Sequence, residues 1–198
     1  MCNIYQFKNT QKAADTFRTA VLAAAAGLAT SVIRKTDPAV VVRAGGAVAV
    51  MRWGLVRTFN PAINNIRAEK LDSGMWNTQP EQRCVIPVTT FWEWGATERG
   101  KKQAHQISHP AGDWFWMAGI WEQDPDRGAC FSMLTTAANP AMAALHDRMP
   151  AIVGRKEANA WLYGQFQPQF PYAGDLHIEP CASPLKKENT DNPQDSLF

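Results

Sequence analysis

Cys2 is the first residue of the chain that could carry out chemistry, because removal of Met1 would leave it at the N-terminus. An N-terminal cysteine carries an α-amine with a pKa of about 8 and a thiol with a pKa of about 8.5 on adjacent carbons. The amine can attack an aldehyde to form an imine, and the thiol can then close on the imine carbon to give a thiazolidine ring. Because one residue holds both nucleophiles, the second step is intramolecular and strongly favoured. By position alone, Cys2 is also consistent with a small apolar side chain packed under a strand.

A carboxylate interrupts the aromatic run Phe91-Trp92-Glu93-Trp94. If this run is a strand, Glu93 points to the face opposite Trp92 and Trp94. The carboxylate then lies either on the sheet surface or in a functional pocket. In a pocket, partial burial would raise the pKa of Glu93 and suit it to proton transfer.

Two polar segments could complete such a pocket. His146 follows a predicted helix and could act as a general acid or base, and Arg148 could bind a phosphate. Asn65 can donate and accept hydrogen bonds at once, so it could orient an amine or a sugar hydroxyl, while Arg67 could reach a backbone phosphate. Taken separately, both segments are also consistent with solvated turns.

The elements that must position these groups can be predicted from periodicity and turn residues. Apolar spacing predicts an amphipathic helix over roughly 11–28, and a cap with proline predicts another over 140–145. A third helix is expected over about 156–163, and residues 54–80 are expected to be mostly loop. The β-prone runs form a hairpin and a series of short strands, at 39–43, 47–52, 84–88, 90–94, 104–108, 115–121 and 130–135. This order predicts an α+β fold with a mostly antiparallel β-sheet or open barrel core and flanking helices.

Length and composition narrow the class of protein. The chain has 198 residues, of which 45% are hydrophobic and 19% charged, so a single globular domain over 1–185 is expected, followed by a polar, disordered tail over 186–198. No apolar run is long enough to span a membrane, and the sparse cysteines, with no C-x-x-C pair, fit a reducing cytoplasm. The residues show no metal-ligand cluster, and no cofactor is expected.

The charge is unevenly distributed along the chain. Residues 1–70 hold ten Lys and Arg against three Asp and Glu, a local +7, whereas residues 71–198 carry −5. This asymmetry predicts a basic surface, unless folding mixes the two parts. Eight tryptophans could stack on unpaired bases or could belong to the core.

The end of the tail is apolar. Gln194, Leu197 and Phe198 resemble the short Gln-x-x-Leu-Phe peptides that dock on bacterial sliding clamps, although such a tail could equally pack its Phe on its own domain.

The ordered set of motifs resembles the SRAP (SOS-response-associated peptidase) family over about residues 1–182. The resemblance is carried by the Met-Cys start, by Trp53-Gly54-Leu55 and by Asn65-x-Arg67-x-Glu69. Phe91-Trp92-Glu93-Trp94 and His146-Asp147-Arg148-Met149-Pro150 follow in the family's order. Each motif is weak by itself, but the ordered set is specific.

The resemblance implies an SRAP-like fold and an enzyme that acts in the DNA damage response. Cys2 would be the nucleophile that becomes covalently joined to an abasic-site sugar in single-stranded DNA, and the other catalytic residues would be Asn65, Glu93 and His146. The DNA-binding residues would be Arg34, Lys35, Trp53, Arg67 and Arg148. Family members remove their own residues preceding the cysteine, but an aminopeptidase could equally remove a lone Met1.

The chain departs from the family pattern in two places. Ile4 stands where members commonly have an arginine, and Lys35-Thr36-Asp37-Pro38 replaces an Asn-x-Ala-Pro loop. Arg34 and Lys35 could then serve as compensating phosphate contacts.

Two other classes of protein compete with this interpretation. An N-terminal-nucleophile amidohydrolase of the glutaminase type also begins Met-Cys, but its oxyanion-hole Asn-Gly pair is absent from this sequence. A non-catalytic single-strand-binding module would show only salt-sensitive, reversible binding. In each case a monomer without membrane association is expected.

Overall fold

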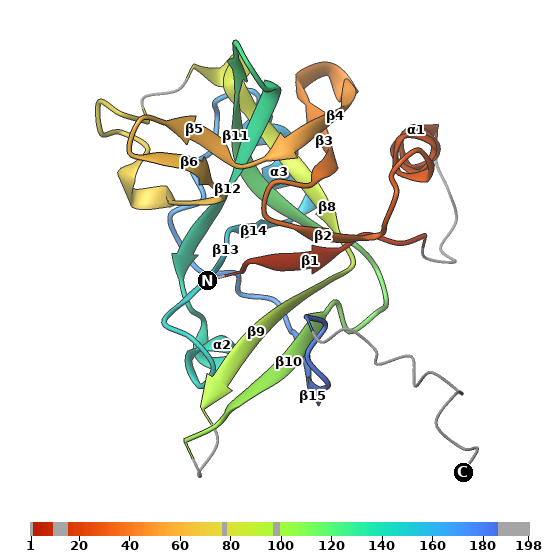
Figure 1. Cartoon of the computed structure of the whole chain (residues 1–198), viewed down its shortest axis with the longest axis vertical. Coiled ribbons are helices and arrows are strands. Elements are labelled where there is room, and N and C mark those ends of the chain that lie inside the picture. The colour runs from red at the N-terminus through yellow and green to blue at the C-terminus, as the bar shows by residue number, and fades with distance from the viewer. Residues whose placement is uncertain (1, 10–15, 77–78, 97–99, 186–198) are drawn as a thin grey trace, which may run out of the picture.

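A computed structural model describes residues 2–9, 16–76, 79–96 and 100–185. One antiparallel sheet has the strand order β15-β10-β9-β1-β2 and runs from the lower part of the molecule, where β15, β10 and β9 lie, to its middle, where β1 and β2 lie (Figure 1). Its strands are β1 (Ile4–Gln6), β2 (Val32–Arg34), β9 (Thr90–Ala96), β10 (Lys102–Ser108) and β15 (His177–Cys181). The N-terminal strand β1 is therefore clamped between β2 and β9, and cannot fray as a free terminus would.

The second sheet forms a barrel, because β12 pairs with both β4 and β11 and so closes the path β12-β4-β3-β8-β11. These strands are β3 (Pro38–Arg43), β4 (Val48–Trp53), β8 (Arg83–Val88), β11 (Phe115–Asp124) and β12 (Gly128–Ala137). Short strands extend the sheet at β13 (Arg148–Pro150), β14 (Ile152–Val153) and β7 (Asn65–Arg67). A separate ribbon consists of β5 (Leu55–Arg57) and β6 (Asn60–Ile63).

The helices lie outside the strands. They are α1 (Thr16–Ala26), α2 (Pro140–Ala143) and α3 (Arg155–Leu162). Asn139 caps α2 by accepting a hydrogen bond from the backbone N–H of Met142 at 3.0 Å, as the sequence predicts. In the described part of the chain, none of the helices has the length and apolar character needed to cross a membrane.

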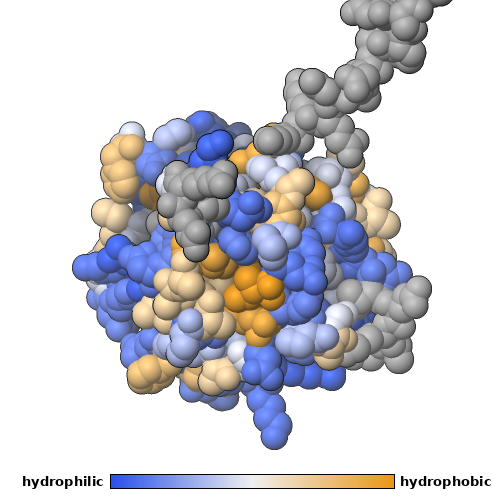
Figure 2. Space-filling model, turned by 90° about the horizontal axis from the view of Figure 1, so that it is seen from below, coloured by the Kyte–Doolittle hydropathy of each residue, from blue (hydrophilic) through white to orange (hydrophobic). Residues whose placement is uncertain are grey.

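The core has apolar side chains on both sides of the barrel wall. Trp53, Phe131 and Tyr5 form one group, with Trp53 stacked at 6.5 Å on Phe131 and edge-on at 4.9 Å to Tyr5. Trp161 of α3 is fully buried in the other group and donates to the carbonyl of Cys84 at 2.9 Å. Seen from below, hydrophilic residues cover much of the surface, and strongly apolar residues gather near its centre, with smaller apolar areas elsewhere (Figure 2).

The predicted fold class is confirmed, with a closed barrel where an open one was allowed. The hairpin and the five later strands lie where the sequence places them. The segment 54–80, expected to be rich in loops, also contains the short strands β5, β6 and β7, which the sequence analysis did not predict. Strand β7 has only three residues, and its stability comes from parallel pairing with β12, a contact that local sequence does not encode.

The helix boundaries also differ from the predictions. The helix expected over 11–28 covers 16–26 within the described residues, and the one expected over 140–145 ends at Ala143. Residues 148–150, for which the sequence analysis predicts no strand, form β13 against β12. The tail over 186–198, including the clamp-like peptide, lies outside the described residues.

Candidate active site

Cys2 lies directly before β1 and is almost completely buried, with 1% of its surface exposed. Its thiol donates a hydrogen bond to the carbonyl of Ile4 at 3.4 Å. Burial, and after it the negative charge of Glu93, raises the pKa of the Cys2 thiol to about 12. The thiol is therefore protonated at neutral pH and needs a proton acceptor before it can react.

Glu93 lies on β9, which pairs with β1 in a register that sets Tyr5 opposite Phe91. Its side chain is 5% exposed, and one carboxylate oxygen accepts the backbone N–H of Trp94 at 3.2 Å. The surface alternative for Glu93 is therefore wrong. The pairing of β1 with β9 explains why a strand carboxylate and the N-terminal thiol come close enough to influence each other.

Asn65 reaches the same cysteine from β7. Its side-chain amide donates to the carbonyl oxygen of Cys2 at 2.7 Å. The other amide atom, Oδ1, is buried and has no hydrogen-bond partner within the described residues. A buried acceptor without a partner is costly, so this oxygen is a natural receptor for an N–H or O–H group that arrives during a reaction.

His146 lies in the short connection between α2 and β13, and its ring nitrogen Nδ1 has two competing partners. It lies 2.9 Å from the backbone N–H of Arg148 and 2.7 Å from a carboxylate oxygen of Asp147. The first contact requires Nδ1 as an acceptor and the second requires it as a donor, so the two exclude each other. Protonation of the ring would thus exchange one contact for the other.

Arg148 is held by a carboxylate. Its guanidinium binds both oxygens of Glu69, at 2.6 and 2.9 Å, and also donates to the carbonyl of Thr135 at 2.6 Å. Hydrogen bonds from Arg148 lower the pKa of Glu69. Arg148 is 8% exposed, so a phosphate could reach it only by sharing or displacing these partners.

Asn65, His146 and Arg148 line a cavity of about 390 Å³, called the amide cavity below. Four of the side chains that line it are amides, those of Asn3, Asn60, Asn64 and Asn65, and its lining also includes Arg67, His146 and Arg148. Cys2 and Glu93 are not part of the lining, but the Cys2 carbonyl is bonded to lining residues. Sequence reasoning missed Asn3 and Asn64, whose only signal was their place next to Cys2 and Asn65.

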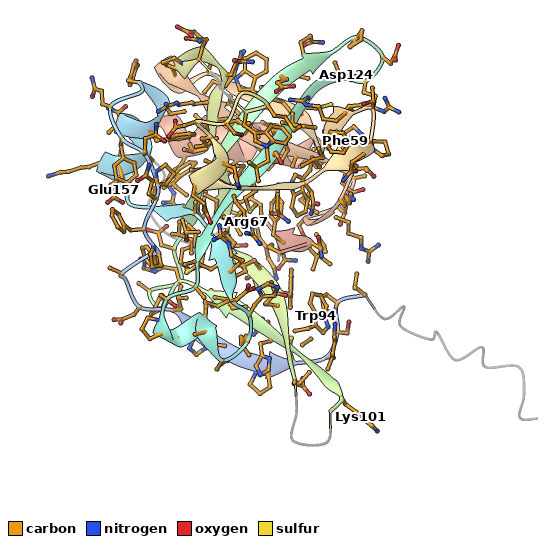
Figure 3. All side chains as sticks on the ribbon, turned by 90° about the vertical axis from the view of Figure 1, so that its left-hand side faces the viewer. Phe59, Arg67, Trp94, Lys101, Asp124 and Glu157 are labelled. Atoms are coloured by element: carbon orange, nitrogen blue, oxygen red, sulfur yellow. The ribbon has the colours of Figure 1, made fainter. Side chains whose placement is uncertain are left out.

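The residues predicted to bind DNA differ in exposure. Arg34 and Lys35 are exposed at the turn between β2 and β3, and Arg67 is exposed beside the amide cavity, on the face seen in Figure 3. The prediction that Trp53 stacks on a base is wrong, because Trp53 is fully buried. Its indole N–H donates to the carbonyl of Asn64 at 2.8 Å, which makes it a core residue that supports the site.

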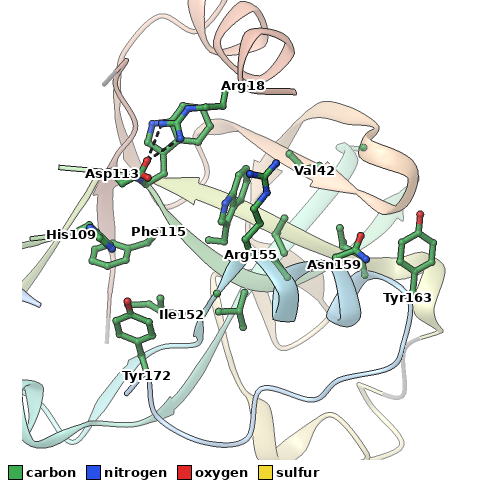
Figure 4. Close-up of a pocket in the computed structure, with 18 of the residues that line it drawn as sticks. Arg18, Val42, His109, Asp113, Phe115, Ile152, Arg155, Asn159, Tyr163 and Tyr172 are labelled. Atoms are coloured by element: carbon green, nitrogen blue, oxygen red, sulfur yellow. Dashed lines mark hydrogen bonds and ion pairs between the residues drawn. The ribbon is translucent and has the colours of Figure 1, made fainter. Parts of the chain in front are cut away.

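A second and larger cavity, of about 620 Å³, lies between α1, α3 and the start of β11 (Figure 4). We call it the aromatic cavity, after Trp114, Phe115, Trp116, Tyr163 and Tyr172 in its lining. It contains none of the predicted site residues. Among its described lining residues there is no cysteine, serine, threonine or lysine.

Within the described ranges, no group of three or more His, Cys, Asp and Glu side chains is arranged to hold a metal ion.

The closed barrel, with an amide-lined cavity whose residues hold the carbonyl of Cys2, defines a β-barrel protein with a candidate site at its N-terminal strand. The family model described as SOS response associated peptidase (SRAP) matches residues 1–183, and the chain belongs to this family.

Two curated relatives carry informative names. The abasic site processing protein YoqW of Bacillus subtilis (strain 168) is 29% identical over 124 residues, which cover 57% of this chain and 55% of the relative. The abasic site processing protein HMCES of Xenopus tropicalis is 27% identical over 150 residues, which cover 58% of this chain and 44% of the relative. The chain thus spans about half the length of the curated relatives it matches.

Solved structures show the same fold. A crystal structure of a protein from Bordetella bronchiseptica matches with a TM-score of 0.72 and 19% identity, over 92% of this chain and 100% of that one. Another, from Bacteroides thetaiotaomicron, matches with a TM-score of 0.66 and 22% identity, over 77% of this chain and 78% of that one.

Proposed function

We propose that the protein processes abasic sites in single-stranded DNA and, once Met1 has been removed, joins Cys2 to the lesion through a thiazolidine. The observation that carries the proposal is the surroundings of Cys2. Burial, and after it the charge of Glu93, raises the pKa of the Cys2 thiol, and Asn65 donates to the carbonyl of Cys2 at 2.7 Å. These contacts support a role in which both nucleophiles of Cys2 act on a single carbon.

Membership of the SRAP family supports this proposal, as do the names of the curated relatives, which are abasic site processing proteins. Removal of Met1 would be the peptidase step, performed by the chain itself or by an aminopeptidase. The adduct would shield the lesion from cleavage during the DNA damage response.

The first step opens the sugar ring, because a closed abasic sugar offers no aldehyde. His146 lines the amide cavity and serves as the acid toward the ring oxygen. Its ring can exchange the Arg148 contact for the Asp147 contact as it gains a proton. The contact with Asp147 would stabilise the proton on the His146 ring before its transfer to the ring oxygen of the sugar.

In the second step, the Cys2 amine adds to the aldehyde carbon, and loss of water leaves an imine. The buried acceptor Oδ1 of Asn65 accepts an N–H of the attacking amine. The Cys2 sulfur then forms a bond to the imine carbon, while its proton moves by way of Glu93 to the imine nitrogen. The net change is the loss of one water, and no oxidant or reductant is consumed.

The carboxylate is needed because the thiol pKa of about 12 leaves almost no thiolate at neutral pH. A nearby base compensates for this by taking the proton as the sulfur attacks. The same burial keeps Cys2 away from adventitious oxidation until a substrate is bound.

DNA would lie across the exposed cations. Arg67 borders the amide cavity, and Arg34 and Lys35 extend the basic surface beyond β2. Arg148 would contribute a phosphate contact shared with Glu69. Single strands are favoured because the lesion must enter a cavity that a paired duplex could not reach without opening.

Further partners belong to the same proposal. The protein would work as a monomer in the cytoplasm, associated with the nucleoid when bound to DNA. The peptide with Gln194, Leu197 and Phe198 would dock on the sliding clamp. Deletion of 194–198 should abolish clamp binding measured by surface plasmon resonance, and no binding by the intact protein would end this idea.

The decisive test mixes the protein, with Met1 removed, with single-stranded DNA that bears one abasic site, followed by a denaturing gel. The proposal requires a shifted band that is absent for Cys2→Ala and absent for undamaged DNA. Glutamine hydrolysis without a band would indicate an amidohydrolase, and reversible binding without a band would indicate a binding module. Mass spectrometry of the adduct should show the mass of the protein plus the DNA minus one water.

A further inference from the structure

Asn64 is a polar residue in the core that the proposed mechanism does not yet use. Its side chain is 9% exposed, and its amide nitrogen donates to Oδ1 of Asn3 at 2.9 Å and to the carbonyl of Cys2 at 3.4 Å. An amide nitrogen carries two N–H groups, so both donors are used. Because both N–H groups are bonded, the buried amide has one orientation. Rotating it by 180° would place its oxygen against the two acceptor oxygens of Asn3 and Cys2.

The backbone of Asn64 is anchored as firmly as its side chain. Its carbonyl accepts the indole N–H of Trp53 at 2.8 Å and the backbone N–H of Met133 at 3.0 Å. Trp53 is fully buried and Met133 lies in the barrel strand β12. Asn64 is therefore fixed to the barrel, and its side-chain amide fixes the position of Cys2 relative to the barrel.

The Cys2 carbonyl accepts from both Asn64 and Asn65, which satisfies both lone pairs of its oxygen. The thiol is held separately, by the carbonyl of Ile4 at 3.4 Å. With the carbonyl and the thiol both held, rotation about the bonds of Cys2 is restricted, and the direction of its amine follows from the position of these two groups.

We propose that Asn64 and Asn3 are positioning residues that set the orientation of Cys2 for its reaction. The role rests on the proposed function, since it concerns the same nucleophile. Asn3 is exposed at the rim of the amide cavity, and it completes the pair by accepting the second N–H of Asn64. This pair leaves Asn65 able to serve two groups, with Nδ2 on the carbonyl and Oδ1 available for the amine.

The test compares the rate of adduct formation with the reversible affinity for the same abasic DNA, the latter measured in a Cys2→Ala background. Asn64→Asp replaces the donor with an oxygen that faces two oxygens, so the adduct rate should fall at least about tenfold, as small misplacements of reacting groups commonly cause. Asn64→Leu removes the donors without adding charge and should give a similar loss. Reversible affinity should change by less than about twofold for Asn64→Leu, because no phosphate contact is lost.

Asn159→Asp is the matched control for added charge. Asn159 lies on the exposed side of α3, and it shares no cavity with Cys2. Its adduct rate should equal that of the wild type. Asn3→Ala tests the pair at an exposed position where folding is not at risk, and it should slow the adduct less than Asn64→Leu does. The double variant should be no slower than Asn64→Leu alone, because both act through one contact.

The outcomes separate this inference from the proposed function. If the wild type forms no adduct, the proposed function fails. If the wild type reacts and Asn64→Leu reacts equally fast, the positioning role is wrong and the function stands. A loss of rate matched by an equal loss of reversible affinity would make Asn64 a DNA contact and would also overturn the role.

Discussion

The two cavities of this protein differ in the contacts of their polar groups and in the reactive groups that lie beside them. In the aromatic cavity, Arg18 lies 3.9 Å above the ring of Trp114 and binds one oxygen of Asp113 at 2.9 and 3.0 Å. In the amide cavity, Asn65 keeps a buried acceptor without a partner among the described residues, and its amide nitrogen donates to the carbonyl of Cys2. The aromatic cavity also has such an atom, because Nε1 of Trp114 is buried without a partner among the described residues. The two cavities therefore differ in the reactive group nearby: lining residues of the amide cavity are bonded to Cys2, whereas no cysteine lines the aromatic cavity.

The largest effect is expected for Glu93→Gln, which tests the role of the carboxylate near Cys2. Removing the carboxylate removes its charge from the vicinity of Cys2, so the pKa of the thiol should fall from about 12. The adduct rate should nevertheless fall by about 100-fold or more, because the proton acceptor is lost. The pH dependence of thiol alkylation and the rate of adduct formation measure the two effects, and a faster adduct in the variant would contradict the role of Glu93.

A second comparison breaks one ion pair in each cavity. Arg148→Met should lower the free energy of unfolding by about 2 kcal/mol, because it leaves buried acceptors such as the Thr135 carbonyl without a partner. Arg18→Met should cost about 1 kcal/mol, since Arg18 and Asp113 are partly exposed and water replaces the lost contacts. Urea denaturation measures both, and equal losses would show that the two ion pairs are equivalent.

The buried thiol predicts a loss of stability in alkali. The pKa of Cys2 is raised from 9.0 to about 12 in the folded state, so the unfolded chain loses this proton first as the pH rises. The contribution is fully present below about pH 8 and declines by up to about 1.4 kcal/mol per pH unit between about pH 9 and 12.

Comparison with Cys2→Ala separates the contribution of the Cys2 thiol to stability from that of the other buried groups. One of these groups is Cys84, since burial also raises its pKa. The difference in free energy of unfolding between the wild type and Cys2→Ala should shrink from pH 8 to pH 10.5. A difference that stays constant with pH would show that the thiol is not buried in solution.

The smallest effect is expected from one exposed arginine at each cavity. Arg67→Gln should weaken binding to abasic single-stranded DNA about fivefold at moderate salt and reduce the slope of log K against log salt by about one. Arg155→Gln, which removes the same charge beside the aromatic cavity, should leave both values unchanged. Fluorescence anisotropy over a range of salt concentrations measures both variants. Equal slopes for the two variants would contradict the binding of DNA beside the amide cavity.

Much of the barrel could be predicted because its long strands carry their own signals. The hairpin of β3 and β4 has glycines at positive φ at Gly45 and Gly46, and β8 to β12 are apolar runs bounded by turn residues. The short strands could not be predicted in this way. β7 and β13 have three residues each, and both depend on pairing with β12.

The residue types of the candidate site could be predicted from the sequence, but some of their roles could not. Cys2, Asn65, Glu93 and His146 are the groups whose chemistry attracts attention. Trp53 was misassigned because a tryptophan has the same stacking capacity in a core as on a surface, and only burial distinguishes the two. Arg148 looks from the sequence like a free cation, but Glu69, far away along the chain, binds its guanidinium.

The sequence by itself determined which reactive groups exist, the order of the motifs that mark the family, and the strands whose apolar pattern is local. Tertiary structure alone decided that a carboxylate on β9 lies beside the thiol and that Asn64 and Asn65 share the Cys2 carbonyl. The physical reason is that these contacts join residues about sixty to ninety positions apart. Their existence depends on strand pairing and burial, and neither is a property of any short segment.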